Sequence, residues 1–249
     1  MGKAKTQRII ANVMALTLAV SAIPFASKVE VNAQPDTEED NLTYQGASVY
    51  STSGNLKEKS VIQGENAEVY EDETQGKVLK LSGKSPQSGV LKLPENLYQN
   101  VTDGFTLTMN VSIADSAADY TRLFQSSCCE MGSKGAPWNS PGVSIDLGSG
   151  NQWRTEVFVG KDSNAAAELE NRTVGDRSIS RETWHSMTFS VDSTKAVLTV
   201  DNESYIISEG DYSKLFGSEK YLDSYVYNAI GDSIYGDASV QASIDLSLI

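Results

Sequence analysis

The sequence predicts an all-β protein built as a two-sheet antiparallel β-sandwich. From residue 47 onward, the chain is a succession of short runs in which apolar and polar residues alternate, with the period of a half-buried strand. Glycine, asparagine, aspartate and serine separate these runs, as they do at turns. A helical period appears only weakly, at 163–170 and 211–216. Together these observations favour packed strands over a helical architecture.

Residues 1–33 have the composition of a secretory signal peptide. Basic residues precede an apolar run at 9–23, and Val31 and Ala33 suit the positions before a cleavage site at Gln34. The apolar run is about 15 residues long, shorter than the ~20 that a membrane-spanning helix needs, which makes an uncleaved anchor the weaker alternative. We therefore expect a secreted or cell-surface protein that is not inserted in the membrane once the signal is cleaved.

The segment that follows, 34–46, is acidic and poor in aliphatic residues, which is typical of a disordered spacer. Loss of residues 1–33 removes four basic residues and one acidic residue, so the net charge changes from −13 to −16. Such a chain repels the phosphates of nucleic acids and anionic lipid surfaces, so we expect no nucleic acid partner. The remaining 47–249 is long enough for one β-sandwich domain with a single core.

Ten strands are clear from the alternation. They are 77–83, 89–94, 105–113, 122–127, 142–148, 153–160, 185–192, 196–202, 203–208 and 242–249. In 105–113 every odd position is apolar and every even position is threonine, asparagine or serine, so one face is expected in the core and the other in water. Asp201 and Asn202 both tolerate positive φ, which predicts a tight hairpin between 196–200 and 204–208.

The single histidine of the chain, His185, begins an apolar row in the strand 185–192. A catalytic base needs a partner that tunes its pKa, and only Glu182 is near in sequence. We therefore expect His185 to be a structural residue whose ring is hydrogen-bonded.

The only two cysteines, Cys128 and Cys129, are adjacent. Neighbouring Cα atoms lie about 3.8 Å apart, closer than the usual span of a disulfide, so a bond between these residues would form a strained ring. The sequence therefore predicts no disulfide framework. Two alternatives stay open for the pair, free thiols or a vicinal disulfide that shapes a ligand loop.

The order of these features resembles the laminin-G-like jelly rolls of the concanavalin A-like lectin and glucanase superfold. The segments that carry the resemblance are GKVLKLSG with GVLKLP, VTDGFTLTMNVSI, TRLFQSS, ETWHSMTFSVDSTKAVLTVDNESYI and YNAIGDSIYGDASVQASIDLSLI, which extend over nearly all of 47–249. The Trp-His strand and its Val-Asp-Asn hairpin are the most specific part, although Ser186 and Asn202 depart from the residues usual in the family. The resemblance implies a jelly roll, a structural role for the Trp-His pair, and a sugar- or protein-binding module often attached to a secreted glycoside hydrolase.

The sequence lacks a convincing catalytic pattern. Glucanases of this superfold carry carboxylates at i, i+2 and i+4 of one strand, so that all three project from one face. The best candidate, ENAEVYEDE at 65–73, fails because Tyr70 takes the middle position after Glu68, and a solvated acidic hairpin explains it better. One histidine gives no arguable Ser-His-Asp set, and no Cys-His metal spacing, phosphate loop or dinucleotide glycine pattern occurs. We therefore expect a non-catalytic domain.

The resemblance also implies calcium as a cofactor, because members of this superfold often carry the ion beside the first and last strands. Hard cations bind clustered carboxylate and carbonyl oxygens, and Asp232, Asp237 and Asp245 are the candidate ligands near the end of the chain. Their spacing is not that of an EF-hand loop. The alternative for Asp232 and Asp237 is a role as turn residues.

A carbohydrate site needs aromatic rings that stack on the apolar faces of sugars and polar groups that bind hydroxyls. The stretch 130–156 offers both, in a Gly-, Pro- and Ser-rich loop that runs into two strands. Its loop tryptophan is expected to bind ligand, the alternative being a lid over the end of the sandwich, whereas Trp153 alternates with valines and is expected in the core. The candidate ligand-binding residues are Trp138 and Asn139 in the loop, Asp146, Arg154 and Glu156 on the wet face, Asn110 and Arg122 beside them, and Tyr227 and Tyr235 near the last loop.

We therefore expect a secreted, non-catalytic, lectin-like module that binds a glycan or polysaccharide. The predicted last strand continues to the end of the sequence, so we expect the module to be part of a longer cell-surface or glycan-degrading protein. Two alternatives stay open. One is an adhesin that binds a host or matrix protein through the same face, and the other is a structural spacer beside a glycoside hydrolase domain.

Overall fold

The computed structural model describes residues 42–44, 47–51, 59–83, 85–133 and 136–246. The expected signal peptide at 1–33 and most of the expected spacer at 34–46 lie outside the described residues. The first described strand, Leu42–Tyr44, falls within the spacer range and therefore precedes the domain start that the sequence indicated. Within the described ranges, no helix is long and apolar enough to cross a membrane.

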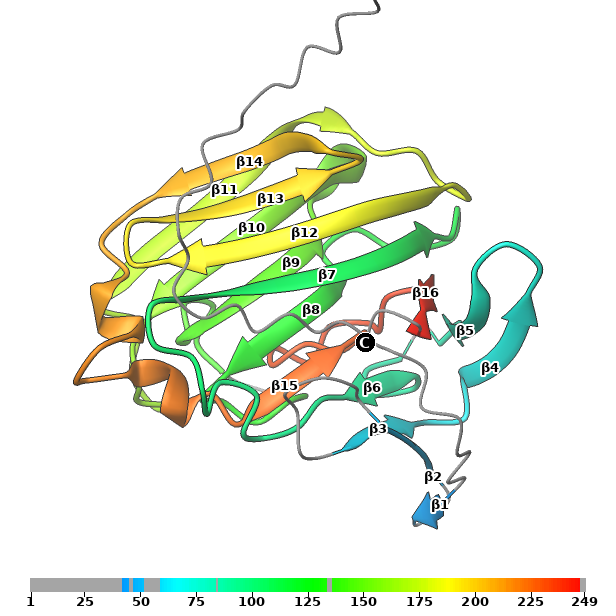
Figure 1. The fold of residues 1–249 in the computed structure, drawn as a ribbon, viewed down its shortest axis with the longest axis horizontal. Helices are drawn as coiled ribbons and strands as arrows, with labels where there is room; N and C mark the ends of the chain where they lie inside the picture. The colour runs from blue at the N-terminus through cyan, green and yellow to red at the C-terminus, as the bar shows by residue number, and fades with distance from the viewer. Residues whose placement is uncertain (1–41, 45–46, 52–58, 84, 134–135, 247–249) are drawn as a thin grey trace, which may run out of the picture.

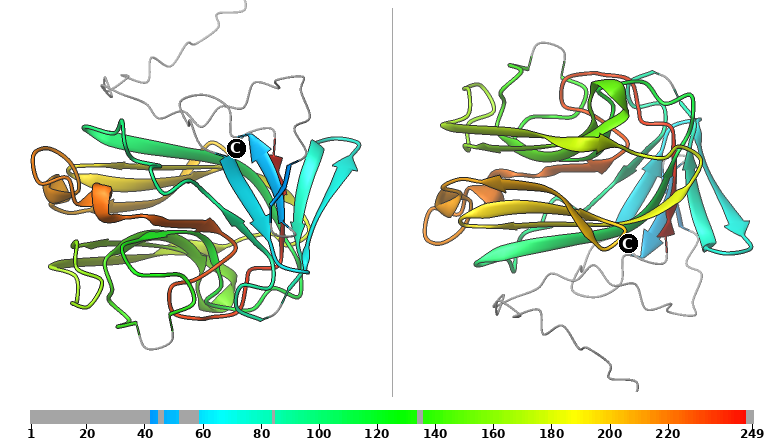
Figure 2. Two further views of the ribbon diagram at one scale, coloured as in Figure 1. Left: turned by 90° about the horizontal axis from the view of Figure 1, so that it is seen from below. Right: turned by 90° about the horizontal axis from the view of Figure 1, so that it is seen from above.

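Two antiparallel sheets pack face to face, as the edge-on views of Figure 2 show. The nine-stranded sheet has the order β1 (Leu42–Tyr44), β2 (Ala47–Ser51), β3 (Lys59–Gln63), β6 (Val90–Lys92), β15 (Tyr227–Ile230), β8 (Arg122–Ser127), β9 (Gly142–Leu147), β10 (Gln152–Val159) and β11 (Leu169–Ser178). The seven-stranded sheet has the order β14 (Glu203–Glu209), β13 (Lys195–Val200), β12 (Trp184–Asp192), β7 (Gly104–Ile113), β16 (Ala242–Asp245), β5 (Gly76–Leu81) and β4 (Ala67–Asp72) (Figure 1). The predicted all-β, two-sheet antiparallel sandwich is confirmed.

The core lies between the sheets and follows the alternation of the strands. Trp153 of β10 is fully buried there, as its alternation with valines predicted. Strand β7 shows the pattern most clearly, because from Phe105 onward its odd positions are buried and its even positions are half-buried. These core residues of β7 are Phe105, Leu107, Met109, Val111 and Ile113.

Strand β16 lies in the middle of the seven-stranded sheet although it is the last of the described strands (Figure 1). Its residues pair with β7 on one side and β5 on the other, with Ile244 opposite both Val111 and Leu79. Both the early strand β5 and the late strand β16 are thus needed to complete the core layer of this sheet.

The weak helical periods at 163–170 and 211–216 do not form α-helices. Leu169 begins the strand β11, and 211–216 contains only the single 3₁₀ turn η2 (Ser213–Leu215). Two other 3₁₀ turns are η1 (Ser149–Asn151) and η3 (Tyr221–Ser224). The acidic stretch 65–73 forms the expected hairpin, in which β4 pairs with β5.

The predicted hairpin after β13 is confirmed, and it holds His185 in place. Asp201 and Asn202 have φ of 52° and 66° at the turn between β13 and β14. The Asp201 side chain lies 2.8 Å from His185 Nδ1, and the other ring nitrogen of His185 lies 3.0 Å from the Ser180 carbonyl oxygen. His185 is only 7% exposed and is followed by the buried alternate positions of β12. It is therefore a structural residue, and its carboxylate partner is Asp201 rather than Glu182.

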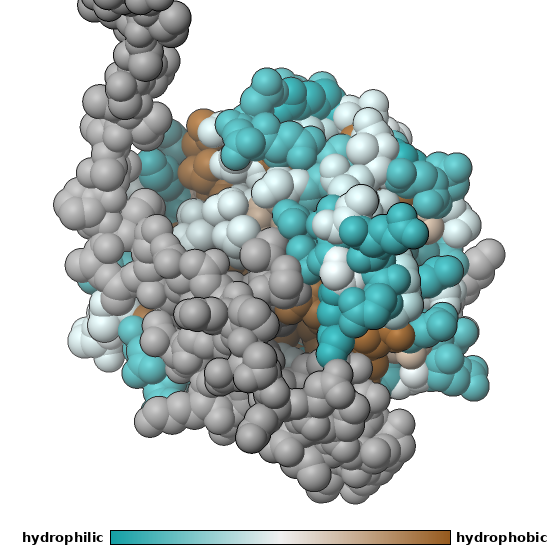
Figure 3. Space-filling model, turned by 45° about the vertical axis from the view of Figure 1, so that its right-hand side comes forward, coloured by the Kyte–Doolittle hydropathy of each residue, from teal (hydrophilic) through white to brown (hydrophobic). Residues whose placement is uncertain are grey.

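The surface in the view of Figure 3 is mostly hydrophilic where residues are described, with small hydrophobic areas between hydrophilic ones. Large hydrophobic side chains that reach solvent are few in the described part of the chain. They are Tyr120, Trp138, Val174, Ile207 and Tyr227. Where such side chains gather on one face of a protein, they often mark a binding surface.

Candidate functional site

The outer face of the nine-stranded sheet, across β8 to β11, carries three transverse rows of side chains. Residues paired across neighbouring strands point to the same face, and Val143, Ile145 and Leu147 of β9 point into the core. The alternate residues of β9 therefore mark the outer face. The rows are Arg122, Asp146, Arg154 and Val174; then Gln125, Ser144, Glu156 and Arg172; then Ser127, Gly142, Phe158 and Glu170. We refer to these residues, with Tyr120 and Trp138 beside them, as the arginine face.

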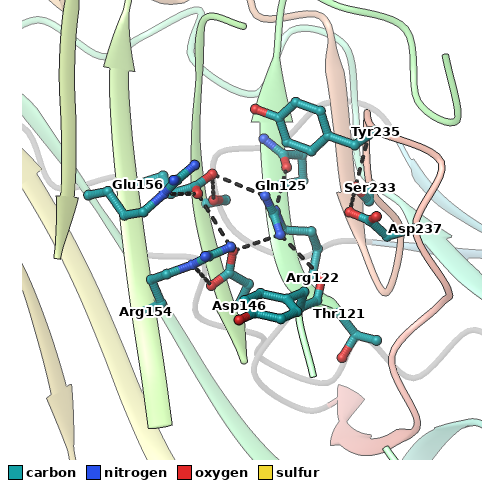
Figure 4. A network of polar contacts seen from close by, with 12 residues as sticks. Thr121, Arg122, Gln125, Asp146, Arg154, Glu156, Ser233, Tyr235 and Asp237 are labelled. Atoms are coloured by element: carbon teal, nitrogen blue, oxygen red, sulfur yellow. Dashed lines mark hydrogen bonds and ion pairs between the residues drawn. The ribbon is translucent and has the colours of Figure 1, made fainter. Parts of the chain in front are cut away.

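Asp146 lies at the centre of the first row and is bound by two arginines. Its Oδ2 is 2.7 Å from Nη1 of Arg122, while Nε and Nη2 of Arg154 donate to its two oxygens at 2.7 and 2.8 Å. Figure 4 shows both guanidinium groups converging on this carboxylate. The side chain of Asp146 is fully buried. Burial raises the pKa of its carboxyl group, and the two arginines oppose that rise by stabilising the ionised form.

Glu156 plays the same part in the second row. Its Oε2 accepts from Nη2 of Arg122 at 3.1 Å and from the Ser144 hydroxyl at 3.4 Å. Its Oε1 accepts from Nε of Arg172 at 2.7 Å and lies 3.4 Å from Nη2 of Arg154. Glu156 thus joins all three arginines of the two rows, and the network holds one more positive than negative charge.

The three arginines differ in how far they are exposed. The side chain of Arg122 is 4% exposed, and it also donates to the Gln125 side chain and to the Tyr120 carbonyl oxygen, both at 3.2 Å. The side chain of Arg154 is 11% exposed, and that of Arg172 is 36% exposed. The network therefore runs from a buried centre at Arg122 to a solvent-exposed edge at Arg172.

Aromatic rings lie against these guanidinium groups. The ring of Tyr120 is 5.2 Å from Arg154, and the ring of Trp138 is 5.4 Å from Arg172. Tyr120 is 48% exposed and Trp138 is 61% exposed, so each ring combines a cationic contact on the protein side with a large area open to solvent. The Tyr235 ring lies over Arg122, 5.0 Å from its guanidinium group, and is partly buried. Figure 4 shows this ring beside Gln125. Burial raises the pKa of the Tyr235 hydroxyl.

The loop that carries Trp138 is held by short hydrogen bonds. The Ser140 hydroxyl donates to the Pro137 carbonyl oxygen at 2.7 Å, and the Asn139 amide donates to Glu170 at 2.5 Å. The Trp138 ring also meets Phe158 edge-on, with ring centres 6.4 Å apart. The loop is therefore a preformed rim of the arginine face, and Asn139 stabilises it.

Most of the residues predicted from the sequence meet here, although their exposure differs from the expectation. Asp146, Glu156 and Arg122 were expected on a wet face, and they do point away from the core, but all three are buried. The Tyr235 ring lies over Arg122. Their polar atoms are bonded to one another, so they support the surface instead of offering themselves to sugar hydroxyls. Trp138, Asn139, Arg154 and Tyr235 also belong to this region.

Two predicted ligand residues lie elsewhere. Asn110 belongs to β7 in the opposite sheet, where its amide donates to Asp245 at 3.2 Å, so its assignment to the site is wrong. Tyr227 pairs with Ser127 and shares the outer face of the sheet, but it stands on β15, on the far side of β8 from β10 and β11.

Arg172 and Tyr120 were missed by the sequence analysis. Arg172 lies on β11, a strand with too few apolar residues to show alternation. Tyr120 adopts a φ of 64° two residues before β8 begins, and an isolated tyrosine in a polar stretch gives no signal of such a position. Its place next to Arg122, a predicted ligand residue at the start of β8, is the one sequence feature that could have indicated Tyr120.

The three aspartates proposed for calcium do not form a metal site together. The described residues contain no group of three or more His, Cys, Asp or Glu side chains that could hold a metal ion. Asp237 accepts a hydrogen bond from the Ser233 hydroxyl at 3.0 Å, and Asp245 is bound by Asn110. Asp232 is 1% exposed and neither of its oxygens has a hydrogen-bond partner in normal geometry among the described residues. Burial raises the pKa of its carboxyl group.

Cys128 and Cys129 are two free, buried thiols close to the Trp138 loop. Cys129 Sγ lies 3.3 Å from the Ser163 carbonyl oxygen, and Cys128 Sγ lies 3.9 Å from that of Pro141. Contact with Cys128 lowers the pKa of Cys129 to about 6, with further hydrogen bonds from Ser140 and Ser127. The same contact raises the pKa of Cys128.

Comparison with known proteins supports the fold. No protein-family model and no curated protein matches the sequence. A sialidase from Trypanosoma rangeli gives a TM-score of 0.50 at 16% identity, with 75% of this chain and 26% of the sialidase covered. Domain 4 of an extracellular arabinanase from Geobacillus stearothermophilus gives 0.44 at 15% identity, covering 76% of this chain and 80% of that domain. The binding domain of botulinum neurotoxin DC gives 0.47 at 11%, covering 86% and 46%. The chain spans only part of the sialidase, and likeness at such identity shows the two-sheet β-sandwich fold alone.

Proposed function

We propose that this protein is a non-catalytic, lectin-like module that binds an oligosaccharide through the arginine face, outside the cell. One observation carries the proposal. Tyr120 and Trp138, both widely exposed, each lie against an arginine whose carboxylate partner is buried. Sugars have apolar faces that stack on such rings and hydroxyls that bind the remaining polar groups.

The positions of the two rings favour a ligand of several sugar units. Tyr120 contacts the arginine of the first row, whereas Trp138 contacts Arg172 of the second row and Phe158 of the third. Successive rows are two residues apart along β9, β10 and β11, about 7 Å. A single sugar ring cannot stack on both aromatics, so we expect affinity to rise with the length of the oligosaccharide.

The state of the carboxylates supports a binding role over a catalytic one. Glycoside hydrolysis requires two carboxyl groups that reach the scissile bond, one of them free to exchange a proton. Asp146 and Glu156 are instead buried and bonded to two and three arginines. We therefore assign them a supporting role beneath the binding surface.

The experiment is a glycan array followed by titration of the full chain and of Trp138→Ala. Stacking of a planar ligand on an aromatic ring contributes about 1–3 kcal/mol, so the variant should bind the selected glycan roughly 5- to 150-fold more weakly. Its thermal stability should change little, because the ring lies outside the core.

Ile207→Ala is the matched control, because Ile207 is 57% exposed on β14 of the other sheet and should leave binding unchanged. An array on which no glycan binds, or equal affinity of Trp138→Ala and the native chain, would contradict the proposal. Either result would move the protein-binding alternative ahead of it.

A further inference from the structure

Arg122 and Arg172 use their guanidinium groups in different ways. All three nitrogens of Arg122 are bonded within the protein, to Gln125, Tyr120, Asp146 and Glu156. Arg172 donates only through Nε, to Glu156 at 2.7 Å. Its two terminal nitrogens have no hydrogen-bond partner among the described residues. Four N–H donors of a half-exposed cation are therefore available to a ligand.

The unused donors of Arg172 are held in a fixed position. Its guanidinium group lies 5.4 Å from the ring centres of both Trp138 and Phe158, and its Nε bond to Glu156 sets its orientation. A planar guanidinium held in this way binds a carboxylate or sulfate through two parallel hydrogen bonds, with little loss of side-chain entropy.

The arginine face is less acidic than the chain as a whole. The three arginines outnumber Asp146 and Glu156 by one, and Glu170 of the third row brings the face to a net charge of zero, in a sequence with a net charge of −13. The Glu170 Oε1 already accepts the Asn139 amide, and Glu170 forms no ion pair with Arg172 among the described residues. The open donors of the network therefore lie at its exposed edge, at Arg172.

We infer that the glycan bound by the arginine face is acidic, with a carboxylate or sulfate group on Arg172 and a neighbouring sugar ring on Trp138. This inference rests on the proposed function and adds the chemical class of the ligand. It concerns a residue that the sequence analysis did not indicate, and it does not require a metal ion.

The test compares neutral, uronate-containing and sulfated oligosaccharides on one array with the full chain, followed by titration of the best binder in each class. Acidic glycans should bind best, and their affinity should fall as salt is raised, since a half-exposed ion pair is screened. Methyl esterification of the uronate should weaken binding about tenfold or more, because it removes the charge and leaves the ring. Comparison of the uronate and sulfate arms identifies the anion.

Two variants assign the effect to Arg172. Arg172→Gln should lose about tenfold to a hundredfold in affinity for the acidic glycan and little for a neutral one, and Arg172→Lys should recover only part of the loss. Glu170→Gln, which removes a nearby negative charge, should bind the acidic glycan at least as tightly as the native chain.

The outcomes separate this inference from the proposed function. If neutral glycans bind best and their affinity depends on Trp138, the inference is wrong and the proposed lectin-like function is supported. If acidic glycans bind but Arg172→Gln binds them equally well, the inference is also wrong. Absence of any glycan binding would overturn both.

Discussion

The outer faces of the two sheets were predicted by the same alternation, yet they differ in kind. On the seven-stranded sheet, β7 and β12 present short side chains that bond across the strands, such as Thr106 with Ser190 at 3.0 Å and Thr108 with Thr188 at 3.5 Å. On the nine-stranded sheet, the same positions hold long ionised side chains, buried in part under loops and joined in one network.

Alternation therefore predicts which way a side chain points and not whether it meets solvent. A row of threonine and serine completes a wet surface at little cost, because each hydroxyl can also bond to water. A row of arginine and carboxylate under loops requires every charge to be paired. The second arrangement is expensive to build, and it positions Arg154 and Arg172 under the exposed rings.

The largest effect that would test this contrast is expected at the centre of the network. Asp146→Ala should destabilise the fold by about 3–5 kcal/mol, because it leaves Glu156 as the one carboxylate that pairs with all three arginines of the network. Denaturant unfolding of the full chain measures it. Asp119→Ala, a substitution of an exposed aspartate, is the control and should change stability little. A loss below 1 kcal/mol in Asp146→Ala would mean that the network is not a structural unit.

Asp232 is a second buried aspartate, and it lacks the arginine partners that Asp146 has. Asp232 is as buried as Asp146 but has no hydrogen-bond partner in normal geometry among the described residues, and burial raises its pKa above the ordinary value of 3.8. Its ionisation therefore destabilises the fold at any pH above that value. Asp232→Asn should gain about 1 kcal/mol of stability at pH 7, and the gain should disappear as the pH falls below 3.8. Unfolding curves at several pH values decide it, and a loss of stability at pH 7 would show that the carboxylate has a favourable partner.

His185 extends the comparison to the core side of the seven-stranded sheet. His185→Gln should lower the free energy of unfolding by about 1 kcal/mol, since the amide cannot keep both the Asp201 and the Ser180 contacts. Affinity for the glycan should stay within a factor of about two, because β12 belongs to the other sheet. A change in affinity without a change in stability would contradict the structural role.

The smallest effect is expected on the threonine face. Thr108→Val keeps the shape of the side chain and removes only the 3.5 Å contact with Thr188. Its stability should stay within about 0.5 kcal/mol of the native chain, as for most surface substitutions. A melting temperature shifted as strongly as that of Asp146→Ala would remove the distinction between the two faces.

Local patterns were sufficient to predict much of the fold. The apolar positions of 105–113 and the Asp201-Asn202 turn are encoded within a few residues, so β7 and the hairpin of β13 and β14 follow from them. Strand β11 was missed because Glu170, Arg172 and their neighbours face the network or solvent and show no apolar period. Pairing with β10, which defines it, is not a local property.

The site was only partly predictable for the same reason. Asp146, Arg154 and Glu156 were placed on the correct face because β9 and β10 alternate. Asn110 was wrongly added, since alternation does not tell in which sheet a strand lies. The burial of Asp146 depends on loops from distant segments, and the contact between Arg172 and Trp138 joins residues on β11 and in the loop before β9.

The central place of β16 bears on the order in which this molecule can be assembled. Without Ala242–Asp245, the seven-stranded sheet is divided into the β4–β5 hairpin and a separate four-stranded part made of β7, β12, β13 and β14. Each part would expose an unpaired strand edge at β5 or β7 until the last strand arrives. Contacts between such distant segments of a chain form slowly. We therefore expect folding to be a late and slow event, completed only after nearly all of the described sequence has been synthesised.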